Sequence, residues 1–175
     1  MKKWIFLTLI LAILLVLGGC SSKEKSTGLK VTEENKSYLD KYEKSLQNDI
    51  KKMTSILKDY NNALDGLYTQ QYSREQFAIA IKGSIEESNE LVSRVESKDV
   101  ESELFEANQN LIALVNRSHQ LLLTAIDMAN QKDTEIDKDF LRTEYMEIKT
   151  QQAVIANDWK ILRGDLEAAE QGEQK

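Results

Sequence analysis

The chain has 175 residues, and its 23 lysine and arginine residues against 29 aspartate and glutamate residues give a formal net charge of -6. Nucleic-acid binding needs a basic stripe that neutralises phosphates, so this balance argues against a nucleic-acid partner. It also argues against a surface that presses onto anionic lipid headgroups. The chain has no proline and seven glycines, a composition that permits long uninterrupted helices.

The first twenty residues have the pattern of a secretory signal. Two lysines precede an apolar run over residues 4–17, and small residues then lead to Cys20. A basic start, a short apolar run and small residues before a cleavage site are typical of a signal peptide. Because a membrane-spanning helix needs about 20 apolar residues, an uncleaved anchor is the weaker interpretation of this shorter run.

The motif Leu17-Gly18-Gly19-Cys20 resembles the bacterial lipobox, in the style of Gram-positive lipoproteins. The resemblance implies cleavage between Gly19 and Cys20 and a diacylglyceryl group on the Cys20 thiol. Two acyl chains anchor a protein stably where one binds only reversibly. The implied location is the outer face of the cell membrane, or the outer membrane if the source is Gram-negative. The alternative, an ordinary signal followed by a chance cysteine, would leave a lone reactive thiol.

The rest of the chain divides by composition. Removal of residues 1–19 leaves 21 basic and 29 acidic side chains, a net charge of -8. Residues 20–32 are small, polar and charged after the cysteine, and we expect a flexible tether there. Residues 33–170 carry helical patterns and form the expected domain. Residues 171–175 are a polar tail that we expect to fray.

Apolar residues at steps of three and four predict four amphipathic helices. The first begins after Thr32 and ends near Gly66, and the second begins at Ser73, where Ser73 and Gln76 fit a capping box. Residues 97–99 break the pattern before the third helix, and residues 130–137 form the loop before the fourth. The expected seams are Leu39, Tyr42, Leu46, Ile50, Met53, Leu57, Tyr60, Leu64 and Leu67; Phe77, Ile81, Ile85, Ser88, Val92 and Val95; Val100, Leu104, Ala107, Leu111, Leu114, Ser118, Leu121, Ala125 and Met128; and Leu141, Tyr145, Ile148, Gln152, Ile155, Trp159, Leu162 and Leu166.

Four such helices with short connections predict an all-α fold, an antiparallel four-helix bundle in which each seam is buried by its neighbours. The stepping by three and four favours the nearly antiparallel, coiled-coil-like packing of such bundles. The alternative joins the second and third helices into one rod over residues 73–131, about 90 Å long, in a three-helix hairpin or an open dimer.

Residue types that carry catalysis or bind cofactors are scarce. The only histidine, His119, lies on a half-apolar flank of the third helix, where a packed boundary residue is the usual reading. No cysteine besides Cys20 can ligate zinc, and there is no glycine-rich phosphate loop. We therefore expect no enzymatic activity and no cofactor other than the lipid.

The segment 133–144 partly resembles a calcium-binding EF-hand loop. Its candidate ligands are Asp133, Glu135, Asp137, Asp139 and Glu144. The loop needs a glycine at its sixth position for a sharp turn, and Lys138 stands there instead. The alternative is an acidic loop in which Thr134 or Asp137 caps the fourth helix, with acids favoured by the helix dipole.

Two groups of residues are candidates for an interaction surface. On the third helix Ile112 and Ile126 flank the seam, so the helix carries more apolar surface than one seam needs. Tyr38, Tyr68 and Tyr72 gather near the ends of the first helix, where tyrosines either contact a partner or cover a bundle end.

The sequence therefore predicts a non-enzymatic lipoprotein, held on the membrane by lipid, that contacts an envelope protein. A homo-oligomer is the alternative for the extra apolar face. Two other functions stay open: a helical module that binds calcium or a small ligand weakly, and a module that binds the cell wall.

Overall fold

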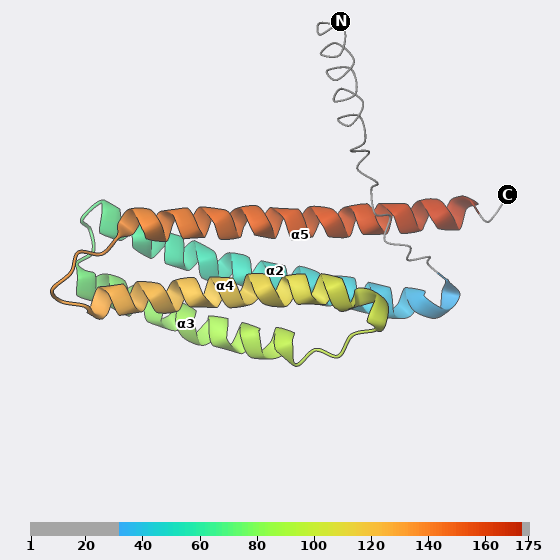
Figure 1. Cartoon of the computed structure of the whole chain (residues 1–175), viewed down its shortest axis with the longest axis horizontal. Coiled ribbons are helices and arrows are strands. Elements are labelled where there is room, and N and C mark those ends of the chain that lie inside the picture. Colours follow the sequence, from blue (N-terminus) through green and yellow to red (C-terminus); the bar gives the residue numbers. More distant parts are fainter. Residues whose placement is uncertain (1–31, 173–175) are drawn as a thin grey trace, which may run out of the picture.

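The computed structural model describes residues 32–172, which form four long helices and no strand. The helices are α2 (Glu33–Tyr68), α3 (Arg74–Glu96), α4 (Phe105–Asn130) and α5 (Lys138–Gly172), with a short 3-10 helix, η1 (Ser102–Leu104), before α4. They run alternately up and down the long axis (Figure 1). The predicted all-α, antiparallel four-helix bundle is confirmed. The expected signal peptide, Cys20 and the tether through residue 31 lie outside the described residues.

Local capping explains where the first two helices begin. The backbone amide of Asn35 donates to Thr32 Oγ1 at 3.3 Å, and the Thr32 amide donates to Asn35 Oδ1 at 2.8 Å. Ser73 and Gln76 form the same reciprocal pair at the start of α3, at 2.8 and 3.3 Å. Each pair satisfies amides that have no partner within the helix. Both predicted helix starts are confirmed.

The predicted break after α3 is confirmed, and the alternative rod over residues 73–131 is wrong. The Ser97 amide closes the last turn of α3 on Ser93, and residues 97–101 are not helical. Val100 was expected to open the third seam but lies in this connection, so the seam begins at Leu104. Glu101 has an extended backbone (φ -62°, ψ 152°), which lets the chain cross to α4 before helix formation resumes.

The core follows the predicted seams, with a shift of phase on α3; the expected seam residues Leu162 and Leu166 lie outside the described side chains. Leu39, Leu57, Leu64, Phe77, Ile81, Leu111, Leu122, Leu141 and Ile148 are among its fully buried members. On α3 the buried face also includes Ser84 and Leu91, whereas the expected Ile85 and Val92 are only partly buried. The face of α3 that meets both α2 and α4 is therefore rotated from its most apolar stripe.

The helices pack in a ring, because α5 contacts α4 and α2 while α3 contacts α2 and α4. The start of α2, the α3–α4 connection and the end of α5 share one end of the bundle (Figure 1). We call it the tether end, because α2, which follows the predicted tether in the sequence, begins there. The α2–α3 turn and the α4–α5 loop share the opposite end, the distal end. At the tether end α2 and α5 extend past α3 and α4 (Figure 1).

Candidate functional site

The tyrosines at the distal end make contacts within the chain. The Tyr68 hydroxyl donates to Asp139 Oδ1 at 2.7 Å, and the cations of Lys138 and Arg142 lie 5.4 and 5.2 Å from the Tyr68 ring centroid. Burial, together with the hydrogen bond to Asp139, raises the pKa of Tyr68. The Tyr72 ring lies so close to Gly66 that a Cβ added there would come within 2.7 Å of it. Tyr72 nevertheless stays 39 % exposed, so these two residues cover the bundle end and leave part of Tyr72 accessible.

The isoleucines expected on the surface of α4 are only partly exposed. Ile112 and Ile126 pack against the core at the edge of α4. Asn116, one turn after Ile112, donates to Glu96 of α3 at 2.8 Å, so this flank faces α3. The apolar excess of α4 is therefore covered in large part by α3. A charge placed at either isoleucine would disturb folding as well as any partner.

In the acidic segment, residues 133–144, three carboxylates accept hydrogen bonds from different groups within the chain. Asp137 Oδ1 accepts from the Phe140 amide at 2.8 Å, so it caps the first turn of α5, as the alternative reading predicts. Asp139 accepts from Tyr68, and Glu144 Oε2 accepts from Arg117 Nη2 at 3.1 Å. Within residues 32–172 no three histidine, cysteine or acidic side chains lie close enough together to hold a metal ion. The structure thus does not gather Asp133, Glu135, Asp137, Asp139 and Glu144 around one point.

His119 is a partly buried residue of α4, on the same flank as Ile112 and Ile126. Its Nδ1 is enclosed and makes no hydrogen bond to the described residues. Burial lowers the pKa of His119, so the neutral imidazole is favoured at neutral pH. This placement matches the boundary position expected from the sequence.

A cluster that the sequence analysis did not identify joins α2 to the end of α3. Asp49, only 2 % exposed, accepts from Arg94 Nε at 2.9 Å and from Lys98 Nζ at 2.6 Å. We call these three residues the Asp49 cluster. The sequence carried a signal for it, because Asp49 stands three residues after Leu46 and four before Met53, at a seam position that an apolar residue would normally fill.

A cavity of about 400 Å³ opens beside this cluster at the tether end, and its lining includes Tyr38, Tyr42 and Lys98. Tyr42 packs against Trp159 with ring centroids 5.2 Å apart. The Tyr42 hydroxyl and the Trp159 indole nitrogen are both enclosed, and neither has a hydrogen-bond partner among the described residues. Burial, and secondarily the charge of Asp49, raises the pKa of Tyr42 to about 12. Tyr38, at the mouth, has a raised pKa because of burial and the charges of Glu103 and Glu101.

Removing the Tyr42 hydroxyl is expected to change the alkaline stability of the protein. The unfolded phenol ionises near pH 10 and the folded one near pH 12, so the proton is held more tightly in the folded chain. The contribution of this protonated phenol to the free energy of unfolding is fully present below pH 10. It is lost by about pH 12, which lowers the free energy of unfolding by about 2 to 3 kcal/mol. Tyr42→Phe should remove that loss and, because it deletes a buried hydroxyl without a partner, raise the free energy of unfolding at pH 7 by about 1 kcal/mol.

Urea unfolding of wild type and Tyr42→Phe at pH 7 and across pH 10 to 12 measures both effects. Tyr72→Phe is the control, since Tyr72 is exposed. An unchanged alkaline slope in Tyr42→Phe would contradict the assignment.

The described part of the chain, residues 32–172, has no helix that is both long and apolar enough to cross a membrane. No protein-family model, curated protein or solved structure matches the chain. The chain is an all-α bundle protein. Its function has to be inferred from its own residues and their geometry.

Proposed function

We propose that the protein is a lipid-anchored, extracytoplasmic lipoprotein whose helical bundle binds another protein of the cell envelope without catalysing a reaction. The observation that carries the proposal is Leu17-Gly18-Gly19-Cys20 directly after a short apolar run with a basic start. A polar segment then leads from Cys20 to Thr32, the N-cap of α2.

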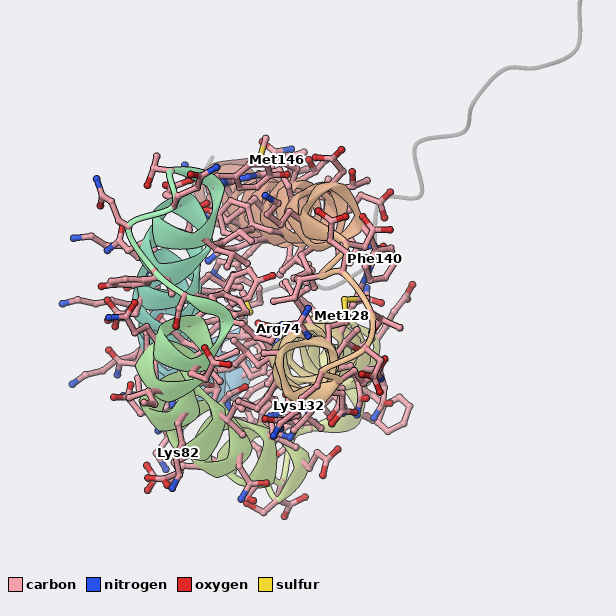
Figure 2. The ribbon with its side chains drawn as sticks, turned by 90° about the vertical axis from the view of Figure 1, so that its left-hand side faces the viewer. Arg74, Lys82, Met128, Lys132, Phe140 and Met146 are labelled. Carbon is pink, nitrogen blue, oxygen red and sulfur yellow. The ribbon has the colours of Figure 1, made fainter. Side chains whose placement is uncertain are left out.

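The length of that segment and the charge of the domain support a bundle held near the membrane but not pressed onto it. Residues 21–31 would reach at most about 36 to 40 Å when extended, at 3.3 to 3.6 Å per residue. The net charge of -8 after the signal opposes contact with anionic headgroups, so the lipid supplies the anchoring. The distal end, which faces the viewer in Figure 2 with Phe140 labelled, would then point away from the membrane.

Exposed apolar side chains support a role in protein contact. Phe105 and Phe140 are 59 and 43 % exposed, and they lie at opposite ends of the bundle. Aromatic residues are enriched in the centres of protein interfaces. An envelope protein is the partner class we propose, because the lipid confines the bundle to the membrane surface.

Replacement of Cys20 by alanine tests the anchor. Wild-type protein extracted from membranes should begin at Cys20, carry the mass of a diacylglyceryl group and partition into detergent. Cys20→Ala should carry no lipid mass, because it lacks the thiol to which the diacylglyceryl group would be attached. Mass spectrometry of the intact protein measures this, with Ser21→Ala as the matched control that should keep the lipid. A wild-type protein without lipid on Cys20 would overturn the proposal.

Chemical crosslinking on intact cells tests the interaction. The lipidated wild type should capture the same envelope protein in repeated purifications, and Cys20→Ala should lose it. Capture of nothing but this chain itself would remove the envelope partner from the proposal and leave the anchored bundle.

A further inference from the structure

A stripe along the outward face of α5 carries no charged residue over five turns. It includes Thr143, Met146, Thr150, Val154, Asn157 and Ile161, all exposed. We call these six residues the α5 stripe. Met146, Val154 and Ile161 are 55, 52 and 55 % exposed, on the side of the helix opposite the buried seam. On α2, by contrast, the exposed positions 44, 51, 58 and 65 are all charged.

The α5 stripe has the spacing of a helix-packing seam. Its members follow one another by three or four residues over residues 143–161, a length of about 27 Å at 1.5 Å per residue. The outer face of a soluble helix is normally charged, and a second seam on that face is typical of a helix that pairs with another helix.

The charges beside the α5 stripe favour a second copy of the same helix in parallel orientation. Lys149 and Lys160 lie on one side of the stripe, and Glu147 and Asp158 lie on the other. Lys149 donates to Gln152 and Glu147 accepts from Arg117 within the chain, so the exposed Lys160 and Asp158 are the charges placed to meet a second copy. A two-fold axis parallel to α5 brings the basic edge of each copy against the acidic edge of its mate. Lys160 of each copy then lies opposite Asp158 of the other, two residues, about 3 Å, away along the axis. An antiparallel pair would place like charges together.

Asn157 supports the same arrangement. It lies in the α5 stripe between Val154 and Ile161, so two parallel copies in register would bring the two Asn157 side chains together. A single asparagine inside a parallel two-stranded seam fixes register and limits the assembly to two strands, at some cost in stability.

We propose that two copies of this chain pair side by side through the α5 stripe, parallel and in register, on one membrane. The proposal rests on the lipid anchor, because two copies attached to the same membrane at their tether ends already share an orientation. One helix face is smaller than the roughly 800 Å² per partner of a standard stable interface. Pairing therefore depends on the high local concentration that shared anchoring provides.

Single introduced cysteines in the full-length chain, oxidised in native membranes, test the pairing. Thr143→Cys, Thr150→Cys and Asn157→Cys should each form a disulfide-linked dimer, because every stripe residue meets its own copy in a parallel pair. Ala80→Cys, at an exposed position of α3, is the matched control. We expect at least about ten times more dimer at the three stripe positions than at the control, since anchoring raises the effective concentration of all four variants but only the stripe positions are held against their own copy.

A charge in the stripe provides the second arm. Val154→Asp in the Asn157→Cys background should reduce the dimer to the level of the control, whereas Ile79→Asp, at a 75 % exposed apolar position of α3, should not. Circular dichroism verifies that each variant folds.

Other outcomes overturn the proposal. A dimer at only one of the three stripe positions would mean antiparallel pairing, none above control would mean no pairing through α5, and a mixed disulfide with another protein would assign the stripe to that partner. Intact mass of the same samples reports lipid on Cys20 separately. Lipidated protein without dimers would contradict the pairing alone, and protein without lipid would contradict the anchor.

Discussion

Replacing Arg94 and Lys98 together by methionine is expected to lower the free energy of unfolding by about 3 to 5 kcal/mol, the cost typical of breaking a buried ion pair. The double substitution leaves Asp49 enclosed between α2 and α3, at 2 % exposure, without either of its ion-pair partners. An isolated carboxylate in that environment loses its hydration without compensation. Arg94→Met alone should cost less, because that side chain is 51 % exposed and water screens its pair.

A third substitution separates the charge effect from lost packing. Adding Asp49→Leu to the double variant should restore stability to within about 1 kcal/mol of wild type, because apolar replacement of a whole buried ion cluster is often neutral or favourable. The matched control is Lys51→Met with Lys58→Met, which removes two exposed positive charges from α2 and should stay within about 0.5 kcal/mol. Urea unfolding measures all five proteins, wild type and the four variants. A double variant as stable as wild type would show that Asp49 finds another source of compensation.

The helix ends could be predicted because their causes are local. Thr32, Ser73 and Asp137 each satisfy an amide three residues along the chain, and the spacing that permits this is visible in the sequence. The phase of α3 was less predictable. Ile85 and Val92 are more apolar than Ser84, but burial depends on where α2 and α4 lie. The sequence of α3 alone does not specify the positions of those two helices.

The Asp49 cluster and the contacts of the acidic segment could not be predicted, because they join residues that are far apart in the sequence. Asp49 and Arg94 are 45 positions apart, and Tyr68 and Asp139 are 71 apart. An unusual acid in a seam marks that a partner must exist, since a buried charge is costly when unpaired. Which lysine or arginine pairs with this acid depends on how the helices are aligned along one another. Only the assembled bundle fixes that alignment.

The α5 stripe is a different case, because its signal was present in the sequence. Met146, Val154 and Ile161 recur at steps of eight and seven on the face opposite the seam of Leu141 and Ile148. One seam is enough to predict an amphipathic helix, so the second stripe did not enter that prediction. The structure adds that this stripe is exposed and that side chains of opposite charge lie on its two sides.

Arg74→Ala is expected to lower the free energy of unfolding by about 2 to 4 kcal/mol. Arg74, at the start of α3, donates Nη1 to the carbonyl oxygen of Met128 at 2.8 Å and to that of Gln131, and Nη2 to that of Thr134. It lies beside the end of α4 and the loop to α5 (Figure 2). One guanidinium thus satisfies carbonyls at the negative end of α4, and hydrogen bonds to a charged group are worth about 1.5 to 3 kcal/mol each.

The fork geometry of Arg74 makes its effect distinguishable from that of charge alone. Arg74→Lys keeps the charge at the end of α4 but cannot reach three carbonyls at once, so we expect it to recover about half of the loss. Lys82→Ala removes an exposed charge from the same helix and should change stability by less than about 0.5 kcal/mol. Amide hydrogen exchange should speed up in residues 131–137 of Arg74→Ala, because the loop loses its attachment to α3. Unchanged exchange there would mean that the loop is held by its own turns and that Arg74 contributes only charge.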